Sequence, residues 1–184
     1  LRKLENEIDT LKSKINSGKK STILLSDKSS NSYNLEKIFL DYSLPAESNK
    51  ISKKNGYLEI FEDFILLGLW SGKIMYINKN YLNNEFVKIN DVKTNIDDFL
   101  KFDDDKFISI KDLMILNGKL FISYTKVIKP ETNCLNLSII YSDIFQEFGE
   151  LKIGNFDEFF TYNECKEARF NGYQSGGRLY KYKD

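Results

Sequence analysis

Short apolar runs separated by turn residues dominate the chain from Tyr57 onward. Helices of ordinary length need longer periodic stretches, so this pattern is typical of an antiparallel β-protein. The runs form two groups of four expected strands each. The first group lies at residues 57–61, 64–70, 73–78 and 86–90. The second lies at residues 107–116, 119–127, 135–141 and 151–160. We therefore expect an all-β fold.

The two groups begin about 50 residues apart, and a third start follows at residues 178–182. Sheet units that recur at this spacing are typical of β-propellers, whose blades are four-stranded antiparallel sheets. The Asn117-Gly118 dipeptide predicts a tight type I′ hairpin, because both of its residues accept positive φ. A two-layer β-sandwich is the competing fold. Because two to three blades do not close a ring, we expect the chain to be an N-terminal fragment.

The N-terminal region has a different pattern. Its apolar residues are spaced alternately by three and four positions, at Leu1, Leu4, Ile8, Leu11 and Ile15. This spacing predicts a short helix over residues 1–20, which is either a stalk or a coiled coil through which the chain self-associates. Residues 21–34 are expected to form a polar connector. The packed domain is then expected to occupy residues 35–184.

Charge and composition exclude several function classes. The chain has 27 basic and 27 acidic residues, so it lacks the excess of positive charge that a nucleic-acid partner requires. It has no His, which excludes Ser-His-Asp and Cys-His catalysis within these residues. Acid-base chemistry would depend on carboxylates, Lys or Tyr. The sequence contains no apolar stretch of the roughly 20 residues that a membrane-spanning helix needs.

Three segments carry a resemblance to a known family. They are LLGLWSGKI at residues 66–74, DLMILNGKLFISYT at residues 112–125 and YQSGGRL at residues 173–179. In this order they resemble the soluble pyrroloquinoline quinone (PQQ)-dependent glucose/sorbosone dehydrogenases. The resemblance implies two to three blades of a six-bladed β-propeller. It also implies PQQ and calcium over one end of the channel, where a sugar or polyol is oxidised.

The resemblance places the candidate catalytic site in the third segment. The family has a His there as general base, and Tyr173 stands in its place. An unperturbed Tyr has a pKa near ~10, against ~6.5 for His, so this exchange weakens the case for catalysis. Tyr173 is either a phenol activated by Arg178 or an aromatic residue that lines the channel without chemistry. Gln174 is the candidate cofactor contact. The other PQQ and calcium ligands are expected beyond Asp184.

The alternative function is a non-enzymatic propeller that binds a glycan or a protein through the same face. The family resemblance also implies an extracytoplasmic location, either periplasmic or membrane-tethered. We expect any tether to lie upstream of Leu1.

Several other residues have a structural and a functional interpretation. Cys134 and Cys165 are either a disulfide or two unrelated thiols. The acidic run at residues 103–105 lacks calcium-loop spacing and is expected to be an exposed turn. Trp70 is expected in the core, with a sugar-stacking platform as the alternative. Gly176 and Gly177 are expected to serve backbone conformation rather than phosphate binding.

Overall fold

A computed structural model describes residues 21–26, 32–37, 56–82, 87–101, 108–132, 134–164 and 176–182. The expected N-terminal helix lies outside these residues. The chain divides into two compact units, one of residues 1–46 and 77–89 and one of residues 47–76 and 90–184. Among the described residues, no helix is long and apolar enough to cross a membrane.

The smaller unit contains a β-hairpin. Its strands, β1 (Ser21–Ser26) and β2 (Ser32–Lys37), pair antiparallel, with Ile23 opposite Leu35. The range expected to be a polar connector therefore includes β1 and the start of β2. The unit also holds the short 3-10 helix η2 (Lys79–Tyr81), whose first turn is capped by the Asn78 side chain.

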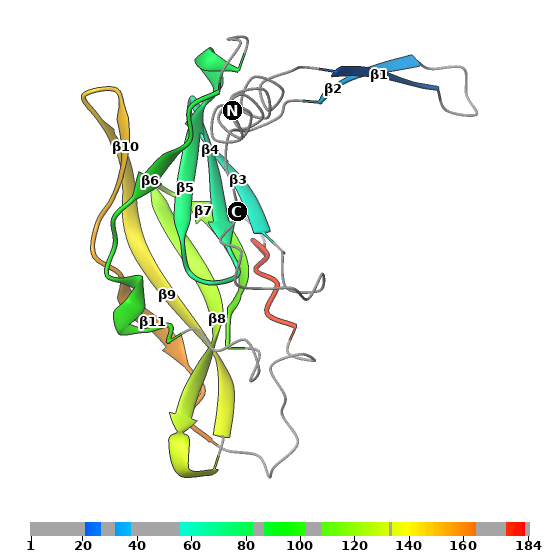
Figure 1. Ribbon diagram of the computed structural model, residues 1–184. Coiled ribbons are helices and arrows are strands. Elements are labelled where there is room, and N and C mark those ends of the chain that lie inside the picture. Colours follow the sequence, from blue (N-terminus) through cyan, green and yellow to red (C-terminus); the bar gives the residue numbers. More distant parts are fainter. Residues whose placement is uncertain are drawn as a thin grey trace, which may run out of the picture. The chain divides into compact units, whose positions relative to one another are not determined.

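The first sheet of the larger unit is a meander of consecutive strands in the order β3-β4-β5-β6 (Figure 1). The strands are β3 (Gly56–Phe61), β4 (Phe64–Leu69), β5 (Ile74–Asn78) and β6 (Asn90–Val92). The first three match the expected strands closely. The fourth begins at Asn90, where the expected strand ended.

The second sheet follows the same plan, in the order β10-β9-β8-β7, with β11 also paired to β9. Its strands are β7 (Ile110–Leu116), β8 (Lys119–Lys129), β9 (Cys134–Glu147), β10 (Glu150–Ile153) and β11 (Asp157–Thr161). The predicted turn at Asn117-Gly118 is confirmed, with φ of 51° and 70° at its two residues. A 3-10 turn, η4 (Pro130–Thr132), joins β8 to β9.

The last expected strand, residues 151–160, is interrupted in its middle. Phe156 leaves the ladder there and is almost fully buried in the core. The side chain of Asn95 binds the backbone of Phe156 through two hydrogen bonds. Oδ1 of Asn95 accepts from the Phe156 backbone N at 2.7 Å, and Nδ2 of Asn95 donates to the Phe156 carbonyl at 3.3 Å. A residue distant in sequence therefore divides one expected strand into β10 and β11.

One apolar core lies between the two sheets. Along β8, Leu120, Ile122 and Tyr124 point inward and are fully buried, as the period of two in a strand requires. Phe64 and Leu66 supply the facing side chains from β4. The short helix η3 (Ile96–Asp98) adds Ile96.

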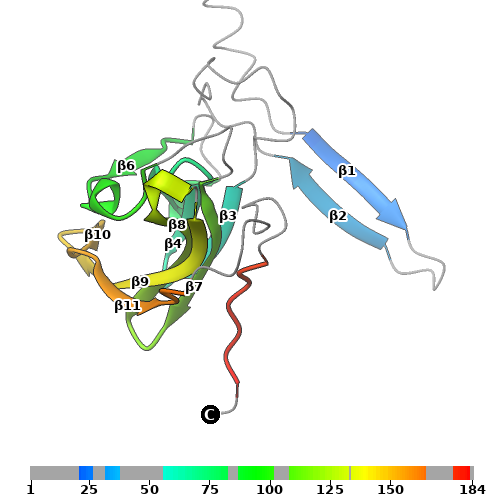
Figure 2. The ribbon, with the colours of Figure 1, turned by 90° about the horizontal axis from the view of Figure 1, so that it is seen from below.

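The two sheets contact each other through their first strands and through their later strands. β3 lies next to β7, and β6 lies next to β10, as Figure 2 shows from below. A Cβ on Gly68 would lie 2.6 Å from Cδ1 of Leu113, so the absence of a side chain at Gly68 leaves room for this residue of the second sheet. The expectation of an all-β fold is confirmed.

We predict that Ile122→Ala lowers the free energy of unfolding by about 2–5 kcal/mol, because the truncation leaves a cavity in the core. Ile60→Ala makes the same chemical change at a side chain that is 65% exposed, and it should stay within about 0.5 kcal/mol of the wild type. Urea denaturation measures both. Equal losses would contradict this assignment of the core.

Candidate functional site

The candidate site is the outer side of the second sheet, where residues 176–182 lie, which include the described end of the predicted site segment. Of the three residues assigned to catalysis and cofactor binding, Arg178 belongs to the described residues, whereas Tyr173 and Gln174 lie outside them. Arg178 is exposed within the extended segment 176–182. Exposure alternates along this segment, because Gly177 and Leu179 are half-buried against the sheet while Arg178 and Tyr180 point outward.

Two side chains of the sheet hold this segment. The Ser123 hydroxyl donates to the Gly177 carbonyl, and the Leu179 backbone N donates to Oδ2 of Asp112 at 2.8 Å. Asp112 and Ser123 are themselves opposite each other in the β7–β8 register. The segment therefore crosses from β8 to β7 on the outer side of the sheet.

Gly177 explains why the segment can lie so close to the strands. Its φ is 110°, which side chains rarely adopt. A Cβ at this position would lie 2.8 Å from Lys111 Cβ and 2.9 Å from Leu137 Cδ1. Gly177 thus has the conformational role expected for it.

A second contact fixes the chain just after β11. The Asn136 side-chain Nδ2 donates to the carbonyls of Tyr162 and Glu164, at 2.8 and 2.7 Å. Cys134, two residues before it in β9, is disulfide-bonded. Cys165 lies outside the described residues, so its pairing with Cys134, one of the two alternatives left open by the sequence, stays a prediction. The chain that leads toward the predicted site is therefore attached to β9 where it leaves the sheet.

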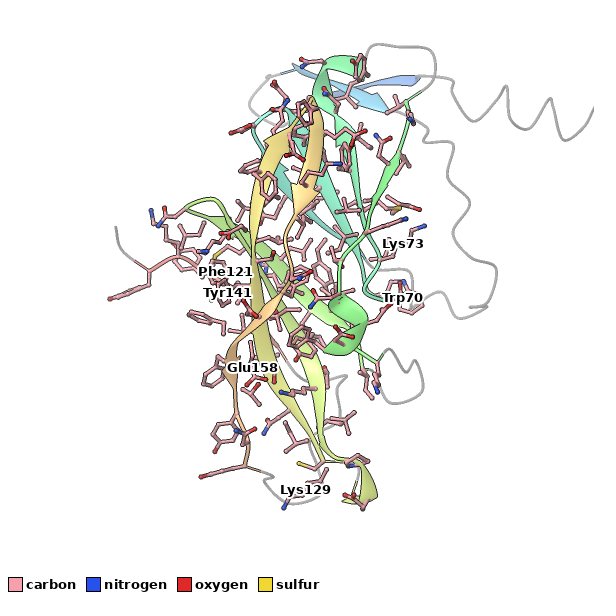
Figure 3. All side chains as sticks on the ribbon, turned by 90° about the vertical axis from the view of Figure 1, so that its left-hand side faces the viewer. Trp70, Lys73, Phe121, Lys129, Tyr141 and Glu158 are labelled. Carbon is pink, nitrogen blue, oxygen red and sulfur yellow. The ribbon has the colours of Figure 1, made fainter. Side chains whose placement is uncertain are left out.

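An aromatic cluster occupies the outer side of β8, β9 and β11, and the sequence analysis did not identify it. The rings of Phe121 and Tyr141, labelled in Figure 3, are stacked with centroids 6.0 Å apart. The Phe159 ring meets both edge-on, with centroid distances of 5.3 and 6.0 Å. Such ring pairs stabilise one another by about 0.5–1.5 kcal/mol beyond their burial. The signal was present in the sequence, because Phe121 and Tyr141 alternate with buried residues in their strands.

Charged residues at the border of this cluster neutralise each other. Nζ of Lys119 lies 2.6 Å from Oδ1 of Asp143 and 5.2 Å from the centre of the Tyr141 ring. The hydrogen bond to Asp143 raises the pKa of Lys119 above its ordinary value. The ring cluster is therefore bordered by a charge-balanced pair.

Negative charge collects instead near the end of the predicted site segment. Asp112 raises the pKa of both Tyr57 and Glu59, although burial is the larger cause for each. Both groups lie on β3, which is next to β7. The shift of the Tyr57 pKa disfavours its phenolate.

On the inner side of the same sheet, the Tyr124 phenol is buried, and its burial favours the protonated form. Burial, and then the charge of Glu158, raise its pKa to about 12. Ser138 lies opposite Tyr124 in the register, and its hydroxyl partly offsets this rise by lowering the pKa of the phenol. The two hydroxyl groups do not meet the geometry of a hydrogen bond. Lys126, further along β8, donates a hydrogen bond to the carboxylate of Glu158, and this bond lowers the pKa of Glu158.

The other sequence-derived candidates are structural or lie outside the described residues. Trp70 is half-buried in the turn after β4 rather than in the core cluster, because the strand ends one residue before it. Asp97 and Asp98 are exposed in η3, and the run at 103–105 lies outside the described residues. The described part of the chain contains no group of three or more His, Cys, Asp or Glu residues that could hold a metal.

Comparison of the chain with protein-family models, with curated proteins and with solved structures gave no match.

We predict that Gly177→Ala releases the segment 176–182 from the sheet, because the added methyl group collides with Lys111 and Leu137. Hydrogen exchange at the Leu179 amide should accelerate, since its bond to Asp112 is lost. Gly176→Ala is the matched control, because a Cβ there meets nothing within 4 Å. Unchanged exchange in Gly177→Ala would contradict the proposed close approach.

The Tyr124 phenol should make the protein sensitive to alkaline pH. Its folded-state pKa of about 12 lies above the ordinary 10.0, so the free energy of unfolding should fall as the pH rises from 10.0 toward 12. Tyr124→Phe should remove this part of the slope while leaving the core volume nearly unchanged. Denaturation curves across this pH range measure the difference, and parallel slopes for both proteins would refute it.

Proposed function

We propose that the chain is part of a glucose/sorbosone dehydrogenase-like β-propeller that takes a sugar or polyol at the mouth of its channel. The observation that carries this proposal is the pair of consecutive antiparallel meanders, with four strands in the first sheet and five in the second, where β11 also pairs with β9. They lie where the sequence repeat predicts them, and two of the three segments that carry the resemblance fall in their hairpins. The first is the β4–β5 connection and the second is the β7–β8 hairpin.

The order of the strands supports a propeller over a sandwich. In immunoglobulin-type sandwiches the chain crosses between sheets, so strands that follow each other in sequence often belong to different layers. Here each sheet consists of consecutive strands. The first strands of the two sheets are neighbours, and so are β6 and β10. Similar blades stacked around one axis would produce this arrangement, with six blades in the family.

The chemistry of the proposed site rests on Tyr173, Gln174 and Arg178. PQQ would supply the two-electron oxidation and calcium would hold it, as the resemblance implies. Among the described residues this set contributes one exposed guanidinium, which does not form a cofactor cradle alone. We therefore derive no catalytic step. Tyr173 stays a candidate base in an enzyme and a candidate channel-lining residue in a binding protein.

A second function is favoured by the exposed aromatic cluster. A non-enzymatic extracytoplasmic propeller that binds a glycan or a protein needs neither PQQ nor a base. Clusters of exposed aromatic side chains are enriched where proteins meet ligands and partners. This alternative accounts directly for the replacement of the family His by Tyr173.

Reconstitution separates the two functions. The full-length protein, loaded with PQQ and calcium, should reduce a redox dye in the presence of an aldose if the dehydrogenase proposal holds. Tyr173→His should raise that rate by about 10²–10⁴-fold, the range typical of a positioned general base. Gln174→Ala is expected to weaken PQQ binding, measured by its absorbance. Absence of turnover in both the wild type and Tyr173→His would leave the binding function as the better proposal.

A further inference from the structure

The β9–β10 hairpin ends in a turn whose residues do not suit its geometry. The last residue of β9, the two turn residues and the first residue of β10 are Glu147, Phe148, Gly149 and Glu150, which we name the hairpin tip. The two central residues have φ of 48° and 79°. Two-residue turns with positive φ at both positions favour Asn, Asp or Gly at the first of them. Phe148 is bulky, so its backbone is strained in this turn.

The β7–β8 hairpin of the same sheet contains the same kind of turn with a suitable residue. Asn117 and Gly118 have φ of 51° and 70°, close to the values of Phe148 and Gly149. The two turns belong to the same end of the sheet, because the Gly118 carbonyl accepts from the Ile144 backbone N at 3.0 Å. One hairpin therefore has the residue that the turn favours, and its neighbour has a residue that the turn disfavours.

The Phe148 ring is also left in water. It is 98% exposed, the highest fraction among the exposed large apolar side chains of the described residues. Glu62 is the third described residue other than glycine with a positive φ, but its side chain is charged and is well solvated by water. Phe148 thus combines backbone strain with an aromatic ring that forgoes the free energy of burial.

Two like charges add to the conflict. Glu147 and Glu150 lie directly opposite each other in the β9–β10 register, and a cross-strand pair of like charges is destabilising. Nζ of Lys152 lies 2.6 Å from Oε2 of Glu150, so two carboxylates are balanced by one cation. Strain, exposure and repulsion therefore occur within four residues. Local choices that oppose the fold in this way are expected at functional positions rather than in a structural turn.

The hairpin tip also stays accessible in the proposed propeller. The first residue of β8, Lys119, pairs with Asp143, whereas β9 continues to Glu147 in its pairing with β10 (Figure 1). Blades arranged around an axis face each other with the sides of their sheets, whereas this tip lies at the end of its strands. Further sheets of the same chain would therefore leave the hairpin tip uncovered.

We propose that the hairpin tip inserts Phe148 into an apolar pocket of a partner protein, and that Lys or Arg side chains border this pocket. The pocket buries the ring, as aromatic anchors are buried in protein interfaces. Its basic border offsets the repulsion between Glu147 and Glu150. The same acidic pair opposes binding to an anionic lipid surface. The proposal does not depend on the sugar chemistry, because the tip contains none of the residues assigned to that site.

Exchange of residues between the two turns tests whether the tip is built for binding. Phe148→Asn should raise the melting temperature by about 2–4 °C, because Asn accepts positive φ and exposes no ring. Asn117→Phe makes the reverse change in the neighbouring turn and should lower the melting temperature. Tyr180→Asn is the matched control, because it removes a ring that is 86% exposed outside any hairpin, and it should leave the melting temperature unchanged. A Phe148→Asn variant no more stable than the wild type would overturn the proposal.

Site-specific cross-linking then identifies the partner. The full-length protein, with photoreactive p-benzoylphenylalanine in place of Phe148, is irradiated in the cells that produce it, and the attached protein is identified by mass spectrometry and purified. The affinity of this purified protein for the wild type should fall roughly 10-fold or more with Phe148→Asn, as for an interface anchor. The affinity should also fall as the salt concentration rises, because salt screens the acidic pair from the basic border. Tyr180→Asn should bind as the wild type does.

Three results would contradict the proposal. The first is that no cross-linked protein binds once it is purified, and the second is an affinity that does not respond to salt. The third is sedimentation of the wild type, but not of Phe148→Asn, with vesicles of neutral phosphatidylcholine, which would assign the tip to a lipid surface instead. Dye reduction should be the same in Phe148→Asn and the wild type, so failure of this proposal and failure of the dehydrogenase function are distinguishable.

Discussion

The shared core between two consecutive meanders is the constraint on which the rest of the structure depends. Each sheet has one apolar side turned to the other, and Tyr124, Phe64 and Leu66 are completely buried there. A hairpin pair alone would expose these residues to water and would be marginal. Gly68 lets the two sheets approach, because any side chain would occupy the place of Leu113. The positions of β3 beside β7 and of the outer faces follow from this packing.

The outer side of the second sheet combines two kinds of contact. Near Ser123, the sheet holds the segment 176–182 through its backbone, while around Phe121 it exposes aromatic rings. Both depend on the same alternation in β8, which sends Leu120, Ile122 and Tyr124 inward. The sheet therefore packs against the core with its inner side and binds the segment 176–182 with its outer side.

The two proposed functions make different demands on this molecule. The dehydrogenase proposal depends on Tyr173 and Gln174 and on a quinone, whereas the binding proposal depends on exposed aromatic side chains such as Phe159. The absence of His in this sequence removes the general base of the family and leaves Tyr173 in its place.

The sequence by itself determined the class of the fold, most strand positions and the Asn117-Gly118 turn, because alternation and turn residues are local signals. It also predicted the conformational role of Gly177. Only the tertiary structure decided that Asn95 interrupts the last strand at Phe156, and that a bulge brings Phe159 and Phe160 to one face. These outcomes depend on partners up to 61 residues away, and a local pattern contains no information about such contacts.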